Sequence, residues 1–511
     1  MTQDDSKIVD SAEKFLIFIF LLTIPLFAFF GISRSFWLDE AYSYFLAASG
    51  NFSQIVDAVK NTAGPPFYYF ILAIWMKIFG ISETSIRSLS SVFYILSLPA
   101  VYYLGKIVYK NKRTAFICSF LFMLSPIVYR HSQNARMYSM VTFIVILSSI
   151  FFFKLVLDNP NSKKDLILFT LINVIGTFTQ FWYFFYFFSL GVAYLLLFFK
   201  KEDKPIRIAF LLSTVPFWVL WTPMLLFQVK GVSAWEEKPT IYNLLESFFG
   251  FYGYVSTMSW PIAFLVYIGF FAIALIQIEN SKLKLEKLNY IKIFVFEKSS
   301  LAFLIICSLT LITPFIGSQV KPIFLAHRYT VIAVLPVAMF FGGLIGKFGN
   351  RLILVGFCYL LLITYTGAFI DRATDPSRGL NTDKTTAKFL VNKTKDSDII
   401  IFTSHSHFTI DYYFILFNLN RKLEKLSYPT SFETSERSLK NISALEVEAE
   451  DLTIRLINLL KGSQSRVWLF YGYDLEVSNT LKYRLDSNLK VVDEFPLAGS
   501  FFNRVIVYKT K

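Results

Sequence analysis

The feature that most constrains this chain is a series of long apolar runs separated by polar loops. A helix that crosses a bilayer needs about 20 mostly apolar residues, and the 511-residue sequence contains eleven candidates. Charged residues make up 17% of the chain, whereas soluble domains carry about 25%. These observations argue against a soluble enzyme and predict a polytopic α-helical membrane protein with spans near 15–33, 88–108, 115–130, 138–156, 166–180, 183–199, 208–227, 260–278, 300–317, 329–346 and 352–370.

The loops between these runs are of two kinds. One kind is short and basic, as at 109–113 and 200–207, and the other is longer and rich in Trp, Tyr, Pro and acids, as at 34–87, 229–259 and 318–328. Loops rich in Lys and Arg stay in the cytoplasm. We therefore expect a cytoplasmic amino terminus and, because the number of spans is odd, an extracytoplasmic carboxyl terminus. Since no targeting features are evident, we expect the membrane to be a bacterial inner membrane.

The end of the sequence differs from the rest in polarity. We expect a transmembrane module at 1–370 and an extracytoplasmic α/β domain at 371–511, which has the size of one domain. The segments "DIIIFTS", "SRVWLFYGY" and "RVIVYKT" indicate buried strands, and "TTAKFLVNKTK" and "EAEDLTIRLINLLK" indicate helices. In "TSHSHFTIDYYF", His405 and His407 would share one face of a strand and could bind a metal. A turn at a strand end is the simpler interpretation, because no cysteine or clear third ligand accompanies them.

Two adjacent acids, Asp39 and Glu40, follow the first apolar run in "SRSFWLDEAYSYF". Ionised groups near a membrane boundary cost free energy unless they are wet or paired. Neighbouring helical residues point about 100° apart, so one acid can face a cavity while the other pairs with a cation. An acidic cap at the membrane interface is the alternative interpretation of the pair.

The same outer loops also contain cations. The segment "LSPIVYRHSQNARMYSM" has two arginines and no acid, so an acid from the first loop or an anionic ligand such as a phosphate would supply the counter-charge. Contact with lipid head groups is the alternative. Acids and cations beside an apolar wall suit a substrate with a charged head and an apolar tail, such as a polyprenyl-phosphate sugar. The candidate binding residues are Arg87, Arg136, Tyr138, Lys321, His327 and Arg328.

Four stretches of the chain, taken in order, resemble a known family. They are "FWLDEAYS", "PPFYYFILAIWMKIFGISETSIRSLSSVFYILSLPAVYYLGK", "LSPIVYRHSQNARMYSM" and "HRYTVIAVLP". The chain is similar to the membrane glycosyltransferases of family 39 in the GT-C superfamily, which includes dolichyl-phosphate-mannose protein mannosyltransferases and lipid A aminoarabinose transferases. Two positions depart from the family pattern: Gly64 stands where His or an acid often precedes the Pro-Pro, and Asn134 stands where Glu is frequent.

The resemblance implies roles for individual residues. Asp39 matches the first acid of the family's Asp-Glu pair, which is the catalytic base, and Glu40 matches the second, so we take both as catalytic candidates. Arg87 matches an arginine that opens the second membrane helix. The remaining matches are candidate contacts to the donor phosphate or sugar: Arg136, Tyr138 and Arg328, to which the loop before the tenth run adds Lys321 and His327.

The function expected from these residues is an inverting transfer of a sugar from a polyprenyl-phosphate donor to an acceptor hydroxyl outside the cytoplasm. The partners are that donor, a lipid, glycan or protein acceptor, and membrane lipids, but no nucleic acid. No cofactor is expected, and a metal is left open. Two alternatives remain, a transporter or flippase for lipid-linked sugars and a GT-C-like binding protein without catalysis.

Overall fold

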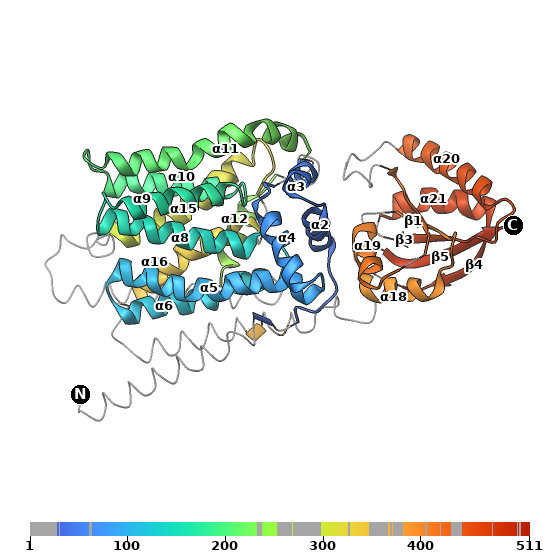
Figure 1. Cartoon of the computed structure of the whole chain (residues 1–511), viewed down its shortest axis with the longest axis horizontal. Coiled ribbons are helices and arrows are strands. Elements are labelled where there is room, and N and C mark those ends of the chain that lie inside the picture. Colours follow the sequence, from blue (N-terminus) through green and yellow to red (C-terminus); the bar gives the residue numbers. More distant parts are fainter. Residues whose placement is uncertain are drawn as a thin grey trace, which may run out of the picture.

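The structure is a computed structural model of the whole chain. It describes residues 28–29, 31–60, 64–231, 238–252, 268, 298–324, 328–346, 366–367, 370, 382–403, 406–419, 421–430, 442–472, 474–497, 499 and 502–511. Helices form a bundle at one end of the molecule and a smaller α/β unit lies at the other (Figure 1). The predicted domain boundary at residue 371 lies outside the described residues.

The described α-helices of the first part range from 7 to 28 residues in length. Their bounds are α2 Leu38–Ala48, α3 Phe52–Val59, α4 Phe67–Phe79, α5 Glu83–Tyr109, α6 Lys112–Met123, α7 Pro126–Ser132, α8 Tyr138–Leu157, α9 Lys163–Thr177, α10 Tyr183–Ala193, the π-helix η1 Tyr194–Phe198, α11 Lys204–Gly231, α12 Ile241–Phe249, α15 Lys298–Gly317, the 3-10 helix η2 Tyr329–Ala333 and α16 Val334–Gly346.

Among the described residues, five helices are long and apolar enough to cross a membrane. They are Glu83–Tyr109, Tyr138–Leu157, Lys204–Thr222, Lys298–Gly317 and Tyr329–Gly346. Each overlaps a predicted span. Most of each of the predicted spans at 15–33, 260–278 and 352–370 lies outside the described residues.

The predicted span at 115–130 is two helices rather than one. Helices α6 and α7 meet at an angle of 63°, and together they could form a sixth span. Pro126 is the first residue of α7. Because proline has no N–H to donate and restricts the residue before it, it begins a new helix rather than continuing the preceding one. The bend therefore follows from the sequence Ser125-Pro126.

The bundle helices approach one another closely where residues are small. A Cβ added at Gly105 of α5 would lie 2.7 Å from the Cα of Ala115 in α6, and one at Gly342 of α16 would overlap Cys118 of α6. Lipid tails are as apolar as the helices, so helix association in a bilayer depends on such tight packing. Helix α6 consequently packs between α5 and α16.

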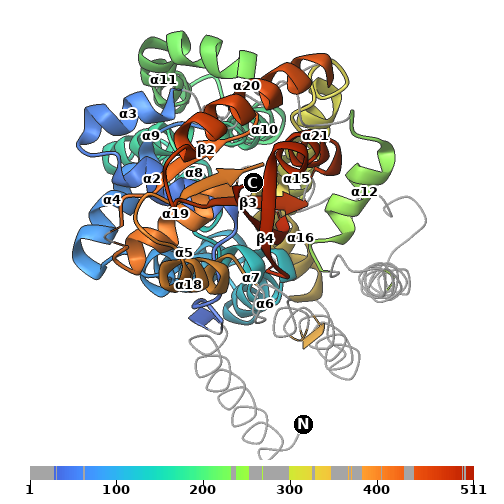
Figure 2. The same ribbon diagram turned by 90° about the vertical axis from the view of Figure 1, so that its right-hand side faces the viewer.

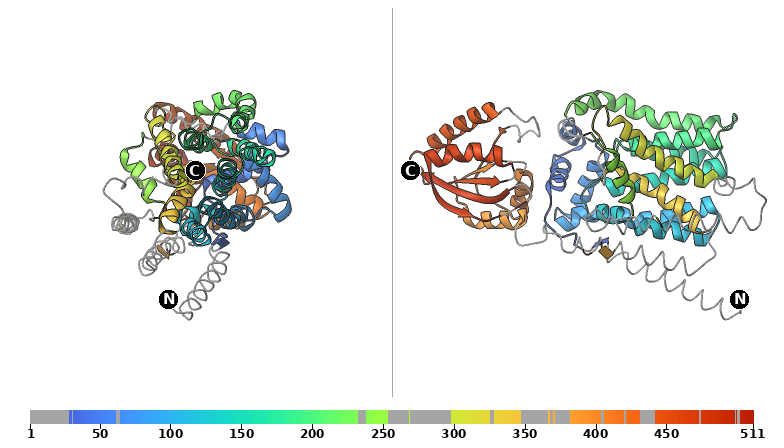
Figure 3. Two further views of the ribbon diagram at one scale, coloured as in Figure 1. Left: turned by 90° about the vertical axis from the view of Figure 1, so that its left-hand side faces the viewer. Right: turned by 180° about the vertical axis from the view of Figure 1, so that it is seen from behind.

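Three short helices, α2, α3 and α4, lie at the end of the bundle that faces the α/β unit (Figures 1 and 3). Helix α4 begins after Pro65-Pro66 and ends at Gly80, whose φ of 83° suits glycine. Its 13 residues are too few to cross a bilayer with ease. Helix α2 carries Asp39 and Glu40 in its first turn.

The α/β unit contains a five-stranded sheet in the order β2-β1-β3-β5-β4. Strand β1 is parallel to β2 and β3, whereas β5 is antiparallel to β3 and β4. The elements are α18 Asp383–Lys393, β1 Ile399–Phe402, α19 Ser406–Leu416, β2 Glu424–Ser427, α20 Ile442–Leu460, β3 Val467–Gly472, α21 Leu475–Asn488, β4 Leu489–Phe495 and β5 Phe502–Thr510.

The two faces of this sheet bury different helices. In β1, Ile399 and Ile401 pack with residues of α20 and α21 in one core. Ile400 and Phe402 point to the opposite face and join a core that includes α18, α19 and the membrane bundle. Alternate strand residues point to opposite faces, so both faces are covered. The α18–α19 face is the one that meets the bundle (Figure 1), and Figure 2 shows the α/β unit in front of the bundle.

Candidate active site

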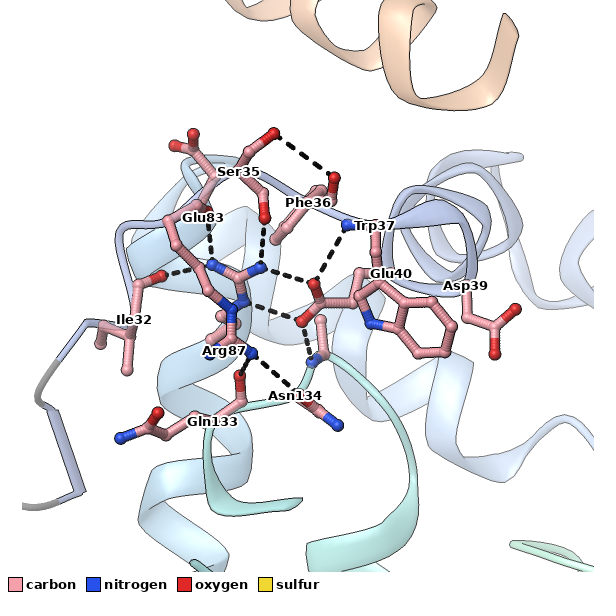
Figure 4. A network of polar contacts seen from close by, with 12 residues as sticks. Ile32, Ser35, Phe36, Trp37, Asp39, Glu40, Glu83, Arg87, Gln133 and Asn134 are labelled. Atoms are coloured by element: carbon pink, nitrogen blue, oxygen red, sulfur yellow. Dashed lines mark hydrogen bonds and ion pairs between the residues drawn. The ribbon is translucent and has the colours of Figure 1, made fainter. Parts of the chain in front are cut away.

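The two adjacent acids of α2 lie in different environments. The carboxylate of Glu40 points toward Arg87, whereas that of Asp39 points away from it (Figure 4). Glu40 and Arg87 form a bidentate ion pair, Nε to Oε1 at 2.7 Å and Nη2 to Oε2 at 2.5 Å, and both side chains are 0% exposed. The sequence-based expectation that one acid pairs with a cation holds for Glu40.

Every N–H of the Arg87 side chain donates a hydrogen bond, either to Glu40 or to a nearby backbone carbonyl. Besides Glu40, the guanidinium donates to the carbonyl oxygens of Ile32, Arg34 and Ser35. Glu40 in turn accepts from the backbone N–H of Ala135 at 2.9 Å. A buried ion pair offsets the cost of desolvation only when its other hydrogen-bonding groups are also satisfied, and that condition is met here.

This arrangement corrects two predicted roles. Arg87 has no N–H left to donate to a phosphate, so the structure does not support a donor contact by this residue. Glu40 is fully buried in the same pair and cannot reach a substrate. Both residues instead connect α2 to α5 and to the segment before α2, and we regard them as positioning residues.

Asp39 is partly accessible and has cationic neighbours. Its Oδ2 accepts from Nη1 of Arg328 at 3.2 Å, with side-chain exposures of 20% for Asp39 and 41% for Arg328. The Arg328 guanidinium also lies over the ring of Trp37, 4.9 Å from its centroid. The two residues are 289 positions apart in sequence, so the fold brings the first turn of α2 and the start of η2 together.

Arg136 reaches α2 from another side. Its Nη1 donates to the backbone carbonyl of Asp39 at 3.3 Å and to Oγ of Ser43 at 3.2 Å, while its Nε has no hydrogen-bond partner among the described residues. Burial disfavours the charged form of Arg136, but the interactions with Tyr69 and Asp39 outweigh it, and the pKa of Arg136 lies well above its ordinary value. A second guanidinium, fully charged, thus lies beside Asp39.

Aromatic rings continue from these cations toward the bundle. The ring of Tyr138, the first residue of α8, is 6.3 Å from that of Tyr329, and Tyr329 is 5.4 Å from Trp182. Close to Trp182, the side-chain amide of Gln180 is buried and has no hydrogen-bond partner within the described residues. Buried amides are normally paired, so Gln180 is a further polar group available near these rings.

The other residues predicted from the sequence are Lys321 and three histidines. Lys321 lies in the turn that follows α15, and it remains a candidate by position. His327 lies outside the described residues, as does His405. His407 is in the first turn of α19 rather than on a strand, so the strand placement that the metal alternative needs does not hold for this residue. Among the described residues, no group of three His, Cys, Asp or Glu could hold a metal.

Sequence reasoning missed three contributors to the site: Arg34, Trp37 and Ser43. Arg34 donates to Oδ1 of Asn134 at 3.0 Å, which gives that departure from the family pattern a structural role. Trp37 stands inside the quoted "FWLDEAYS" motif, and Ser43 is one helical turn after Asp39, so their spacing from Asp39 could have indicated both.

Comparison with solved structures identifies the fold first. The structure superposes on ArnT from Cupriavidus metallidurans in the apo state with a TM-score of 0.66, at 11% sequence identity and over 97% of this chain and 98% of that chain. The form of ArnT bound to undecaprenyl phosphate gives a TM-score of 0.61 at 12% identity, over 96% and 98% of the two chains. The chain therefore has the fold of ArnT.

A comparison of the sequence with protein families also finds a match. Residues 63–227 match the family described as Dolichyl-phosphate-mannose-protein mannosyltransferase. A search of curated proteins by sequence finds no significant match. The family match runs from α4 into α11, which includes Arg87, Arg136 and Tyr138, and it agrees with the resemblance that the motifs indicated.

Proposed function

We propose that this chain is a GT-C glycosyltransferase that moves a sugar from a polyprenyl-phosphate donor to an acceptor hydroxyl on the extracytoplasmic side of the membrane. The observation that carries the proposal is the partly exposed Asp39 at one end of an apolar helix bundle, whose carboxylate pairs with Arg328 and whose backbone carbonyl accepts from Arg136. The family match and the fold of ArnT, which has been solved with undecaprenyl phosphate, support the same substrate class.

In the proposed reaction, Asp39 acts as the general base. The acceptor oxygen bonds to the anomeric carbon as the bond from that carbon to the phosphate oxygen breaks, and the acceptor proton moves to the Asp39 carboxylate. A single displacement of this kind inverts the anomeric centre. For this role Asp39 must exchange its contact with Arg328 for the acceptor hydroxyl, and its 20% exposure makes the carboxylate accessible for that exchange.

The arginines stabilise the leaving group. Negative charge grows on the lipid phosphate as the bond to the sugar breaks, and fixed cations aimed at that charge lower the barrier. Arg328 and Arg136 are suited to this because their guanidinium groups bind phosphate oxygens through paired N–H donors. The Trp37 ring under Arg328 holds the guanidinium in place. The polyprenyl tail would lie along the apolar surface of the bundle.

The test uses Asp39→Asn in the purified full-length protein. Incubation with a radiolabelled undecaprenyl-phosphate sugar and candidate acceptors should give covalent product with the wild type, and general-base loss should lower the rate by about 10²–10⁴-fold. Asp57→Asn is the matched control, since Asp57 is an exposed carboxylate on the neighbouring helix α3. Wild-type rates from Asp39→Asn would exclude Asp39 as the base.

The same assay separates the alternatives. A flippase would move the labelled lipid across vesicles without forming a covalent product in detergent. A GT-C-like binding protein would retain labelled undecaprenyl phosphate and form no product with any acceptor. Covalent product in detergent that depends on Asp39 would exclude both.

A further inference from the structure

A tyrosine hydroxyl of the α/β unit lies beside the segment that surrounds the Glu40–Arg87 pair. The backbone N–H of Phe36 donates to Oη of Tyr413, in α19, at 2.7 Å. The Tyr413 hydroxyl can itself donate to Ser35 Oγ or Glu83 Oε1, each at 3.3 Å. Tyr413 is 0% exposed, so all these contacts are made away from water.

The segment that Tyr413 holds is the one that builds the site. Three consecutive residues bind three different parts of the molecule. The Ser35 carbonyl accepts from Arg87 Nη2 at 3.0 Å, the Phe36 N–H donates to Tyr413, and the Trp37 N–H donates to Glu40 Oε2 at 3.4 Å. Asp39, the proposed base, follows two residues after Trp37. The hydrogen bond from Phe36 to Tyr413 therefore lies between the contacts of Ser35 and Trp37, which fix the start of helix α2.

A second link joins the same units through Glu83. Lys384 of α18 pairs with Glu83 Oε1 at 2.6 Å, and Glu83 is in the first turn of α5, one helical turn before Arg87. Burial, and then the charge of Glu83, raise the pKa of Tyr413 above its ordinary value. The hydroxyl therefore keeps its proton and remains a donor within this group of residues.

We propose that Tyr413 is a positioning residue for the transfer reaction, acting through the 35–37 segment to hold Asp39 in register with Arg328 and Arg136. The catalytic part of this inference rests on the proposed function above. This inference assigns a structural role to the α/β unit. Removal of the Tyr413 hydroxyl oxygen would loosen the start of α2, whereas all the charged side chains of the site would remain.

The neighbouring residue supplies a matched control. Tyr412 is also buried in α19, and its hydroxyl donates to the Ile81 carbonyl at 2.8 Å. That bond holds the α/β unit to the loop before α5 and does not touch residues 35–37. Tyr412→Phe and Tyr413→Phe each remove one hydroxyl oxygen. Tyr412→Phe removes the bond to Ile81, whereas Tyr413→Phe removes the bond from Phe36 and the one donated to Ser35 or Glu83, so the variants differ in which segment loses its partner.

The experiment compares hydrogen exchange and kinetics in the full-length variants. An N–H left without its partner exchanges more readily through local opening, so we expect Tyr413→Phe to raise the exchange rate of peptides covering residues 35–42 about tenfold, and Tyr412→Phe to change it less than threefold. With labelled undecaprenyl-phosphate sugar, kcat should fall about tenfold or more in Tyr413→Phe alone, while KM for the donor changes less than threefold.

Equal exchange in the two variants, or an equal loss of kcat, would overturn the positioning role. If Tyr413→Phe does not fold, Lys384→Met is the second variant, since Lys384 is 37% exposed and its loss weakens the same group through Glu83. It should raise exchange of the 35–42 peptides about threefold, and unchanged exchange would overturn the proposal. The exchange comparison needs no turnover, so a wild type that transfers no sugar would contradict the proposed function without deciding this test.

Discussion

Asp39 and Glu40 are neighbours in sequence but belong to two regions with opposite properties. Around Glu40, the carboxylate, the guanidinium of Arg87 and the backbone groups between them are all buried and paired. Around Asp39, the ion pair with Arg328 is partly exposed. The difference indicates that a well-ordered buried pair fixes the backbone while the adjacent accessible pair remains free to exchange partners with a ligand.

The strongest test of this contrast removes one acid at a time and measures thermal unfolding in detergent. Glu40→Ala leaves the Arg87 charge buried and unpaired, which costs about 3–5 kcal/mol. Asp39→Ala breaks a partly exposed pair, whose contribution is about 0–1 kcal/mol. We therefore expect a large fall in melting temperature for Glu40→Ala and a small one for Asp39→Ala. Equal losses would show that the two regions are not distinct.

The second test concerns transfer rather than stability. Arg328→Gln keeps a polar side chain but removes the charge proposed to meet the leaving phosphate, so we expect turnover with labelled donor to fall about 10²-fold while the melting temperature changes little. Arg455→Gln on α20 removes an exposed arginine that pairs with Glu424 and serves as the control. A similar loss of turnover in the control would remove Arg328 from the proposed mechanism.

The smallest effect is expected from Trp37→Leu. A guanidinium over an indole face contributes about 0.5–1 kcal/mol at an exposed site, and Leu keeps an apolar contact without the π electrons. We expect binding of undecaprenyl phosphate, measured by titration of the purified protein, to weaken by about two- to fivefold. An unchanged dissociation constant would mean that Trp37 does not orient Arg328.

Apolar runs and local signals predicted much of the fold. The spans at 88–108, 138–156 and 300–317 lie within or along α5, α8 and α15. Strands β1, β3 and β5 lie where short β-branched and aromatic runs indicated them, and α18 and α20 where helical spacing did. These segments share a strong local preference, since hydrophobic length or periodicity decides their structure. The side of the membrane on which each loop lies remains a prediction.

Helix α19 was not predicted because both of its sides are covered. Its sequence "SHFTIDYYFIL" is rich in aromatic and β-branched residues that favour strands. One side packs with the sheet core and the other meets α2, where Tyr412 contacts Phe36 and Tyr44. A helix buried on both sides lacks the polar stripe that reveals a helical period, so tertiary contacts outweigh the local preference.

Only part of the candidate site could be predicted from the sequence. Asp39, Arg136 and Arg328 were chosen from motifs, and the fold places them together. The role of Arg87 was not predictable, because its partner Glu40 is 47 positions away and a lone arginine near a membrane interface looks the same whether it binds lipid phosphate or a buried acid. Only the backbone carbonyls around it decide between the two.

The three anchors at Ser35, Phe36 and Trp37 have a consequence for how such a chain can change. Since each residue meets a partner from a different element, adding or deleting one residue here would shift the following helix by about 3 Å along an extended backbone. Side chains on the outer surface of the bundle can be exchanged with little effect, but the number of peptide units between Ser35 and Asp39 is fixed by geometry. Engineering that respects this spacing can alter the surrounding side chains and still keep the Asp39 carboxylate in place.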